Sequence, residues 1–334
     1  MRGVMHILGH PLLPLKLARH AEDSQLFNCW NFCKLAEKLE LDYCYYGLAD
    51  SELPPGTHGT LMSLADYGKG PWEYRNLFHK RYNAALSAAL AQNWRKNAAP
   101  QWVASIYGVA QSDIEVPPDA LLFEPMVGYG SCWTHNRVFP SQAQRNAIYA
   151  SQRDAQSDAQ NDAVIPHFVD PAEYDFSAAT GRYLLYLGRN NPNKGVAIAQ
   201  ETAKQSALPY RGVFSGCHGA AKRKLLSGAR AVLMPTRYPE PFGYVAIEAM
   251  LSGTPVIASD WGAFPEIIQQ GVTGWCCNTQ AEFTAAAEKA ATLDRAAIRA
   301  YAIKRFTIDA VADAYRKYLE FLLTLKRKSS IEAK

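Results

Sequence analysis

Long hydrophobic runs are absent from this chain of 334 residues. No segment approaches the ~18 uninterrupted apolar residues that a membrane-spanning helix requires. The apolar stretch Val4–Leu8 is too short for a secretory signal, and no small-residue cleavage site follows it. We therefore expect neither a membrane span nor a secretory leader, and we predict that Val4–Leu8 is the first strand.

The cysteines do not form the spacing patterns that are typical of disulfide frameworks or zinc sites. Seven cysteines occur at irregular spacings, and no Cys-x-x-Cys pair exists. This usage argues against a disulfide framework or a zinc site, and it predicts buried thiols in a reducing cytoplasm. The sequence also lacks any Asp-x-Asp pair, which excludes that acidic metal-binding motif.

Charge is unevenly distributed over a composition that is otherwise typical of a soluble globular protein, with 48% apolar and 20% charged residues. The length favours two domains. Residues 1–175 carry a net charge of −5, whereas residues 176–334 carry +9. The acidic half is a poor nucleic-acid surface, whereas the basic half could attract a small anion, a membrane or a polynucleotide. Solvated helix faces are an equally good explanation of the excess, and Lys222–Lys224 is interpreted as such a face or as a ligand-side patch.

Short apolar runs alternate with longer amphipathic segments throughout the chain. This order predicts an α/β fold with two parallel sheets, each covered by helices on both faces. In the first half we expect strands at Val4–Leu8, Leu41–Tyr46, Trp102–Tyr107, Ala120–Phe123 and Ala163–Ile165, and helices at Arg19–Leu39, Trp72–Asn97 and Ser141–Arg153. In the second half we expect strands at Tyr183–Leu187, Ala231–Met234 and Val256–Ala258, and helices at Gly195–Gln205, Tyr244–Leu251, Ala281–Ala291 and Asp309–Leu325.

A change of pattern marks the boundary between the two halves. The segment 170–181 has the proline, glycine and mixed polarity of a linker. We therefore predict a first domain over residues 1–172 and a second over 173–312, both Rossmann-like. Residues 313–334 are predicted to form a C-terminal helix and tail.

Two carboxylates eight positions apart, Glu240 and Glu248, flank a Pro-Phe-Gly turn. A buried strand is predicted before them and a helix is predicted to begin at Tyr244, so one carboxylate lies in the loop and the other on the helix. Free amides at such a helix start favour an anionic ligand, and carboxylates on either side can accept hydrogen bonds from hydroxyls. Such pairs also arise by chance on helix surfaces, but Glu248 lies in an otherwise apolar helix, where an unpaired carboxylate is costly to bury.

A second motif follows the strand Tyr183–Leu187. The strand ends at Gly188, and a polar loop carries Arg189 and Lys194 before the next helix. Two cations at the carboxyl edge of a parallel sheet suit a diphosphate, although a basic solvent loop would have the same composition. Two further glycine-containing loops, Asp260–Glu266 and Gly271–Trp275, are predicted near the same edge.

Taken in order, these elements resemble the C-terminal half of a GT-B glycosyltransferase of the large retaining family called GT4. The resemblance covers about 95 residues and comprises strand-Gly-Arg…Lys-Gly, strand-Pro-Thr, Glu-Pro-Phe-Gly…Glu-Ala-Met, Gly-Thr-Pro-Val-Ile-Ala, Gly…Pro-Glu and Gly-x-Thr-Gly. It implies two Rossmann-like domains that face each other across a cleft. The first would bind the acceptor, the second would bind the nucleotide sugar, and the last helix would cross back to the first domain.

The resemblance also implies a role for each motif residue. Arg189 and Lys194 would bind the donor diphosphate at the strand end marked by Gly188, and Glu240 would bind donor-sugar hydroxyls. Glu248 would bind the ribose hydroxyls. With Arg189 and Lys194, Glu240 completes the expected catalytic set. The amides of the turn and the helix start would contribute to donor binding; they belong to Phe242, Gly243 and Tyr244.

The first half departs from the family pattern. Members often have a Gly-Gly loop after the first strand, whereas this chain has Gly9 followed by His10 and Pro11. Gly9 is still expected to contribute to donor binding. Segments 122–129 and 137–139 resemble poorly characterised bacterial and phage members, and the candidate acceptor-side residues are His10, Glu124, Tyr129 and Arg137.

The expected function is metal-independent transfer of a sugar, with retention of anomeric configuration, to an unidentified acceptor hydroxyl. A UDP-sugar is the expected donor and a GDP-sugar the alternative, with no other cofactor. We expect a glycan or lipid-linked glycan as acceptor, with a modified nucleic-acid base as the alternative. The expected setting is the cytoplasm or the inner face of a membrane. Two other functions stay open: a sugar-nucleotide 2-epimerase or hydrolase of the same fold, and a non-catalytic nucleotide-sugar-binding protein.

Overall fold

The computed structural model describes residues 2–16, 23–64, 67, 73–95, 100–128, 130, 132–152 and 159–332, with side chains up to residue 326. The chain divides into two compact units. Unit 1 comprises residues 1–139, 147–165 and 311–334, and unit 2 comprises residues 140–146 and 166–310. Each unit contains one five-stranded parallel sheet, which confirms the predicted α/β class.

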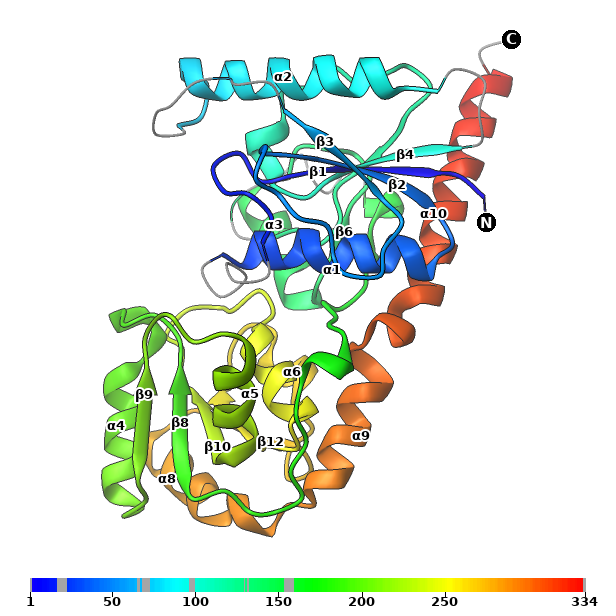
Figure 1. Cartoon of the computed structure of the whole chain (residues 1–334). Helices are drawn as coiled ribbons and strands as arrows, with labels where there is room; N and C mark the ends of the chain where they lie inside the picture. The colour runs from blue at the N-terminus through cyan, green and yellow to red at the C-terminus, as the bar shows by residue number, and fades with distance from the viewer. Residues whose placement is uncertain are drawn as a thin grey trace. The chain divides into compact units, whose positions relative to one another are not determined.

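Unit 1 is built on a sheet with the strand order β3-β2-β1-β4-β5. Its strands are β1 (Val4–Leu8), β2 (Asp42–Gly47), β3 (Thr60–Ser63), β4 (Gln101–Ser105) and β5 (Leu121–Phe123). Helices α1 (Ser24–Lys38) and α2 (Leu77–Asn93) lie on opposite faces of this sheet (Figure 1). The unit also contains the short pair β6 (Val138–Phe139) and β7 (Ala163–Val164), the second half of α3 (Gln142–Ser151) and most of α10 (Ile308–Glu332).

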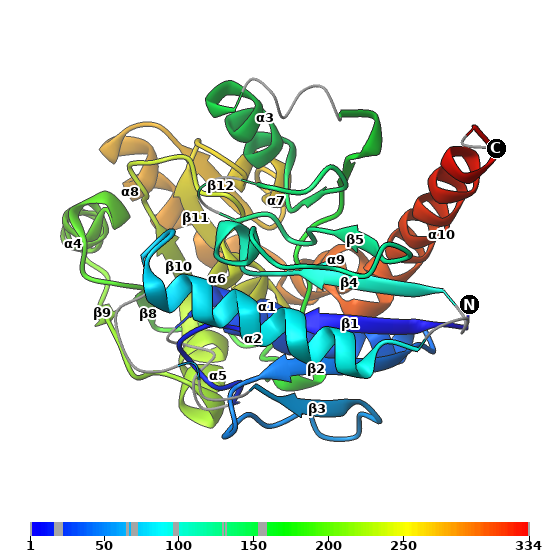
Figure 2. The same cartoon turned by 90° about the horizontal axis from the view of Figure 1, so that it is seen from above.

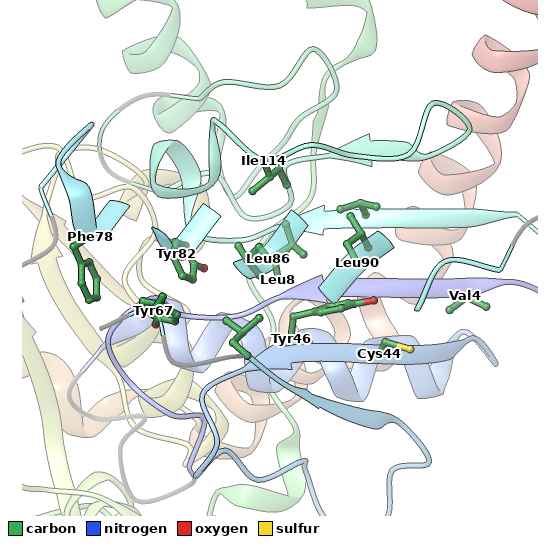
Figure 3. Close-up of a cluster of buried hydrophobic side chains, with 12 residues drawn as sticks. Val4, Leu8, Cys44, Tyr46, Tyr67, Phe78, Tyr82, Leu86, Leu90 and Ile114 are labelled. Atoms are coloured by element: carbon green, nitrogen blue, oxygen red, sulfur yellow. The ribbon is translucent and has the colours of Figure 1, made fainter. Parts of the chain in front are cut away.

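One side of the first sheet is filled by a hydrophobic cluster beneath α2. Seen from above, α2 lies over the sheet and runs roughly along its strands (Figure 2). Tyr82, Leu86 and Leu90 of α2 point toward Leu8 of β1 and Tyr46 of β2 (Figure 3). Because both faces of this sheet are covered, β1 is buried along its whole length, which explains why its residues are apolar except for His6.

Unit 2 repeats this architecture with the strand order β12-β11-β10-β8-β9. Its strands are β8 (Tyr183–Leu187), β9 (Tyr210–Val213), β10 (Ala229–Met234), β11 (Val256–Ser259) and β12 (Gly274–Cys277). Helices α4 (Val196–Gln205) and α8 (Gln280–Lys289) pack on one face, and α5 (Gly219–Gly228) and α6 (Tyr244–Leu251) lie on the other (Figure 1). The short helix α7 (Phe264–Ile267) and the longer α9 (Arg295–Phe306) complete the unit.

The predicted elements exist, with shifts at their ends. Strands Val4–Leu8 and Tyr183–Leu187 and helix Tyr244–Leu251 have the predicted bounds. The strands β3, β6, β9 and β12 and the helices α7 and α9 were not predicted, and of α5 only the helix face at Lys222–Lys224 was. None of the helices in the described part of the chain is both long enough and apolar enough to span a membrane.

Candidate functional site

The candidate residues of the second half gather at one edge of the sheet in unit 2. Neighbouring parallel strands end at the same edge, so the loops that follow β8, β10 and β11 lie close together. The loop after β8 carries Arg189 and Lys194, and the loop after β10 carries Glu240. The third loop, 260–263, packs against Glu240, because the Ala263 amide donates to the Glu240 carbonyl at 2.9 Å.

Gly195 allows the first two loops to touch. Its φ is +72°, and a Cβ atom built there would lie only 1.8 Å from the Pro235 carbonyl oxygen. Any side chain would therefore push the two loops apart. A backbone hydrogen bond of 2.7 Å from the Arg237 amide to the Asn193 carbonyl also joins the loops, and the contact brings Lys194 toward the end of β10.

Glu240 is the first paired carboxylate of the site. Lys194 Nζ lies 2.8 Å from its Oε2 atom, and the Tyr238 hydroxyl donates to the same oxygen at 2.5 Å. The Lys194 ammonium also lies over the Tyr238 ring, 4.8 Å from its centre. The Glu240 side chain is only 8% exposed, so these partners compensate for the cost of burying its charge.

Glu248 is the second paired carboxylate, on the buried face of α6. Its Oε1 atom accepts from Lys222 Nζ at 2.6 Å and from the Tyr174 hydroxyl at 3.1 Å. Its Oε2 atom is buried and has no hydrogen-bond partner among the described residues. Burial raises the pKa of Tyr174, which keeps its hydroxyl protonated as a donor. One Glu248 oxygen is thus fixed by the protein and the other retains its capacity to accept.

The turn between the two carboxylates requires glycine. Gly243 has a φ of +94°, and a Cβ atom there would lie 2.8 Å from the Phe264 ring. The next residue, Tyr244, is the first residue of α6. Its amide and those of Phe242 and Gly243 thus precede or open a helix, where partial positive charge favours an anion.

His167 holds this turn from behind and was not predicted as a site residue. Its ring stacks on Tyr244 with centres 4.7 Å apart and meets the edge of Phe242 at 4.9 Å. Burial lowers the pKa of His167 to about 3, so the ring is neutral at physiological pH. The only sequence signal was its place in the Pro166–Asp170 segment that precedes the second sheet.

Gly188 and Arg189 occupy the rim of the same edge. The Gly188 amide donates to the Val213 carbonyl at 3.0 Å, which ties the end of β8 to β9. The Arg189 side chain is exposed and forms no ion pair with the described residues. It is therefore available to an anion arriving from solvent.

Glu266, in the loop motif after β11, stabilises the start of α3. Its carboxylate accepts from the amides of Gln142 and Ala143, both at 2.8 Å, and so caps the first turn of α3. Ser141, just before α3, donates to the Pro241 carbonyl at 2.7 Å, beside Glu240. The loop motif thus stabilises the backbone around the site.

Gly9 and His10 lie after β1 in unit 1, and both have local partners. The Gly9 amide donates to the Tyr46 carbonyl at 2.8 Å, and its carbonyl accepts from the Tyr82 hydroxyl at 2.6 Å. His10 Nδ1 accepts from two backbone amides of its own loop, at 2.9 and 3.0 Å. The proton is therefore on Nε2, which lies 3.5 Å from the Asp23 carboxylate. The donor role of Gly9 and the acceptor-side role of His10 stay predictions.

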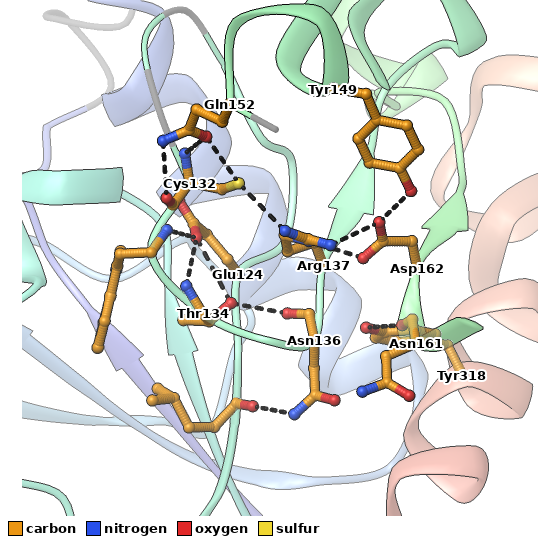
Figure 4. Close-up of polar contacts among 12 residues, drawn as sticks. Glu124, Cys132, Thr134, Asn136, Arg137, Tyr149, Gln152, Asn161, Asp162 and Tyr318 are labelled. Atoms are coloured by element: carbon orange, nitrogen blue, oxygen red, sulfur yellow. Dashed lines mark hydrogen bonds and ion pairs between the residues drawn. The ribbon is translucent and has the colours of Figure 1, made fainter. Parts of the chain in front are cut away.

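Glu124 and Arg137 are both buried in a polar network of unit 1 (Figure 4). Glu124 accepts from the amides of Trp133 and Thr134, and burial raises its pKa to about 7. The Arg137 guanidinium forms two hydrogen bonds with Asp162, at 2.7 and 2.9 Å. These contacts join the segments around Glu124, Arg137 and Asp162 to one another. The predicted acceptor-side roles stay untested, and Tyr129, the fourth candidate, lies outside the described residues.

Comparison with known proteins matches part of this site to a known family. Residues 213–305, which include Glu240, Glu248 and Lys222, match the family Glycosyl transferases group 1. An uncharacterized glycosyltransferase of Methanocaldococcus jannaschii is 41% identical over 76 residues, which cover 22% of this chain and 19% of that protein. The chain thus spans about a fifth of the length of that relative.

Solved structures match over nearly the whole chain at low sequence identity. A glycosyltransferase involved in avilamycin A biosynthesis has a TM-score of 0.72 and 18% identity, with 96% of this chain and 98% of that chain covered. The Anabaena protein HepE in complex with UDP-glucose has a TM-score of 0.57 and 14% identity, with 96% and 99% covered. These matches confirm the GT-B fold, with two Rossmann-like parts, and residues 213–305 carry a Glycosyl transferases group 1 domain.

Proposed function

We propose that this protein is a glycosyltransferase that moves a sugar from a nucleotide-sugar donor to an acceptor hydroxyl. One observation carries the proposal: two buried carboxylates flank the glycine turn that opens α6, and each accepts from one lysine and one tyrosine. Carboxylates suit the hydroxyls of a sugar and a ribose, and the helix start between them suits a diphosphate. A nucleotide sugar has these three parts in this order.

Each residue then has a task in the reaction. Negative charge grows on the diphosphate as the glycosidic bond breaks, and Arg189, Lys194 and the amides at the start of α6 stabilise it. Glu240 binds and orients the donor sugar, and Glu248 binds the ribose. We propose that the leaving phosphate itself accepts the proton of the acceptor hydroxyl, with retention of configuration. In this scheme the protein supplies no strong base, and the diphosphate needs no metal ion.

We propose a UDP-sugar as the donor, with a GDP-sugar as the alternative. The Anabaena protein of the same fold was solved with UDP-glucose, which supports a uridine nucleotide. The nucleoside would lie at the Glu248 end of the site, and the sugar at the Glu240 end.

The acceptor is proposed to be a glycan or a lipid-linked glycan bound by unit 1, in the cytoplasm or at the inner face of a membrane. The −5 charge of residues 1–175 weighs against a nucleic-acid base. Among the candidate acceptor-side residues, Glu124 and Arg137 are buried and committed to internal partners. We therefore expect them to shape the acceptor-binding surface rather than to touch the acceptor.

A thermal-shift screen of nucleotide sugars tests this function, because a ligand that binds only the folded state raises the melting temperature. We expect a shift with a nucleotide sugar and its nucleoside diphosphate, and none with the free sugar. Glu248→Gln should weaken nucleotide binding by about tenfold, the loss of one charge-assisted hydrogen bond. No shift with any nucleotide sugar would contradict the proposal.

A further inference from the structure

Among the described residues, Lys222 is the cation that touches Glu248. The sequence was interpreted to place it on a solvated helix face or, alternatively, in a ligand-side patch. Lys222 lies in the first turns of α5, and its side chain is 20% exposed. Its neighbour Lys224 is exposed, whereas Arg223 pairs with Asp175 at 3.3 Å. Of the three consecutive cations, only Lys222 points toward the candidate site.

The two carboxylate oxygens of Glu248 differ in their hydrogen bonding. Oε1 is fully engaged by Lys222 and Tyr174, whereas Oε2 has no partner among the described residues. An ionised carboxylate that is 1% exposed is stable only if a cation or strong donors compensate for its lost hydration. Tyr174 alone is a neutral donor, so the charge of Glu248 depends on Lys222.

We propose that Lys222 is a positioning residue that fixes the Glu248 carboxylate, with Oε2 presented to the ribose hydroxyls of the nucleotide. This inference rests on the proposed function, since it assigns a ribose to Glu248. Lys222 acts through Glu248. Its contribution is to make the free oxygen a strong acceptor, because hydrogen bonds to an ionised group are about twice as strong as neutral ones.

Few other charges lie around Glu248 to replace Lys222. Cys217, which precedes α5, is close enough to interact with both Lys222 and Glu248, but burial raises the pKa of its thiol, so it stays neutral. Arg299 of α9 donates to the Tyr174 and Leu251 carbonyls and is thereby committed to the backbone. Among these residues, Lys222 is therefore the cation that compensates for the burial of Glu248.

The test compares Lys222→Met with Lys224→Met, which removes the same charge from the same helix away from Glu248. Binding of UDP-glucose and GDP-mannose to each variant and to the wild type is measured by calorimetry at about pH 7. Lys222→Arg, which keeps the charge, is measured as well. Thermal melting checks that each variant folds.

We expect Lys222→Met to lower nucleotide-sugar affinity by about tenfold, whereas Lys222→Arg and Lys224→Met should bind much as the wild type does. Adding Glu248→Gln to Lys222→Met should lower the affinity little further, since Lys222 acts through Glu248. If the wild type binds and Lys222→Met has the affinity of Lys224→Met, the inference is wrong while the proposed function stands. If the wild type binds neither compound nor any other nucleotide sugar, both fail.

Discussion

Lys194 and Glu240 should stabilise the folded protein as a pair, and their coupling can be measured without knowledge of the acceptor. At 2.8 Å, two unit charges attract each other by about 6 kcal/mol at an effective dielectric constant of about 20. Desolvation offsets most of this attraction, and solvent screens Lys194, whose side chain is 21% exposed. We therefore expect a net coupling of about 2 kcal/mol.

The perturbations are Lys194→Met, Glu240→Gln and the double variant. Lys194→Met removes the cation beside a carboxylate that is 8% exposed, so it should lower the free energy of unfolding by about 2–3 kcal/mol. The double variant should be more stable than Lys194→Met alone, because no unpaired charge stays buried.

Urea denaturation of all four proteins completes the double-mutant cycle. Lys224→Met, which removes an exposed cation from α5, is the matched control and should change stability by less than about 0.5 kcal/mol. Strictly additive effects of the two substitutions would show that Lys194 and Glu240 are not energetically coupled.

Three further predictions concern other parts of the molecule. In the folded state burial raises the pKa of Glu124 from 4.5 to about 7, so the folded protein holds this proton more tightly than the unfolded chain does. The free energy of unfolding should therefore fall by about 2–3 kcal/mol between about pH 5 and about pH 8. Glu124→Gln should remove that fall in urea denaturation at the two pH values, and an equal fall in the wild type and the variant would contradict the burial argument. Gly195→Ala should destabilise by about 3 kcal/mol or more, because its Cβ atom would overlap the Pro235 carbonyl oxygen, and an unchanged melting temperature would refute the loop contact. Arg189→Ala should lower turnover by about 10²–10³ with little change in melting temperature, whereas turnover within threefold of wild type would exclude a role at the diphosphate.

The sequence was sufficient to predict the strands that are buried on both faces of a sheet. β8 is a continuous apolar run, and β1 is one except for His6, because helices cover both faces of their sheets; the bounds of both strands were predicted correctly. The edge strands β3 and β9 were missed, since their residues are half-exposed and carry no apolar run. The bounds of helix α5 were not predicted, because the Lys222–Lys224 cations obscure its apolar positions.

The candidate site was predictable only where its residues lie in consecutive loops of parallel strands. Lys194 and Glu240 meet because β8 and β10 are neighbours and end at the same edge, a consequence of topology that the element order already implied. Tyr174 and Lys222 reach Glu248 from 74 and 26 positions away. No local sequence pattern predicts such contacts, since they depend on how α5 and the segment before β8 pack against α6. His167 escaped notice for the same reason.

The most direct test of the account follows a labelled donor sugar. The protein is incubated with nucleotide sugars that carry a radiolabel in the sugar, together with a crude cell extract as the source of acceptors, and Glu240→Gln serves as the matched control. We predict that label enters an acceptor, that nucleoside diphosphate is released in equal amount, and that Glu240→Gln abolishes most of the transfer. Release of free or epimerised sugar with no labelled acceptor, or no release of nucleoside diphosphate from any donor that binds, would contradict the assignment as a glycosyltransferase.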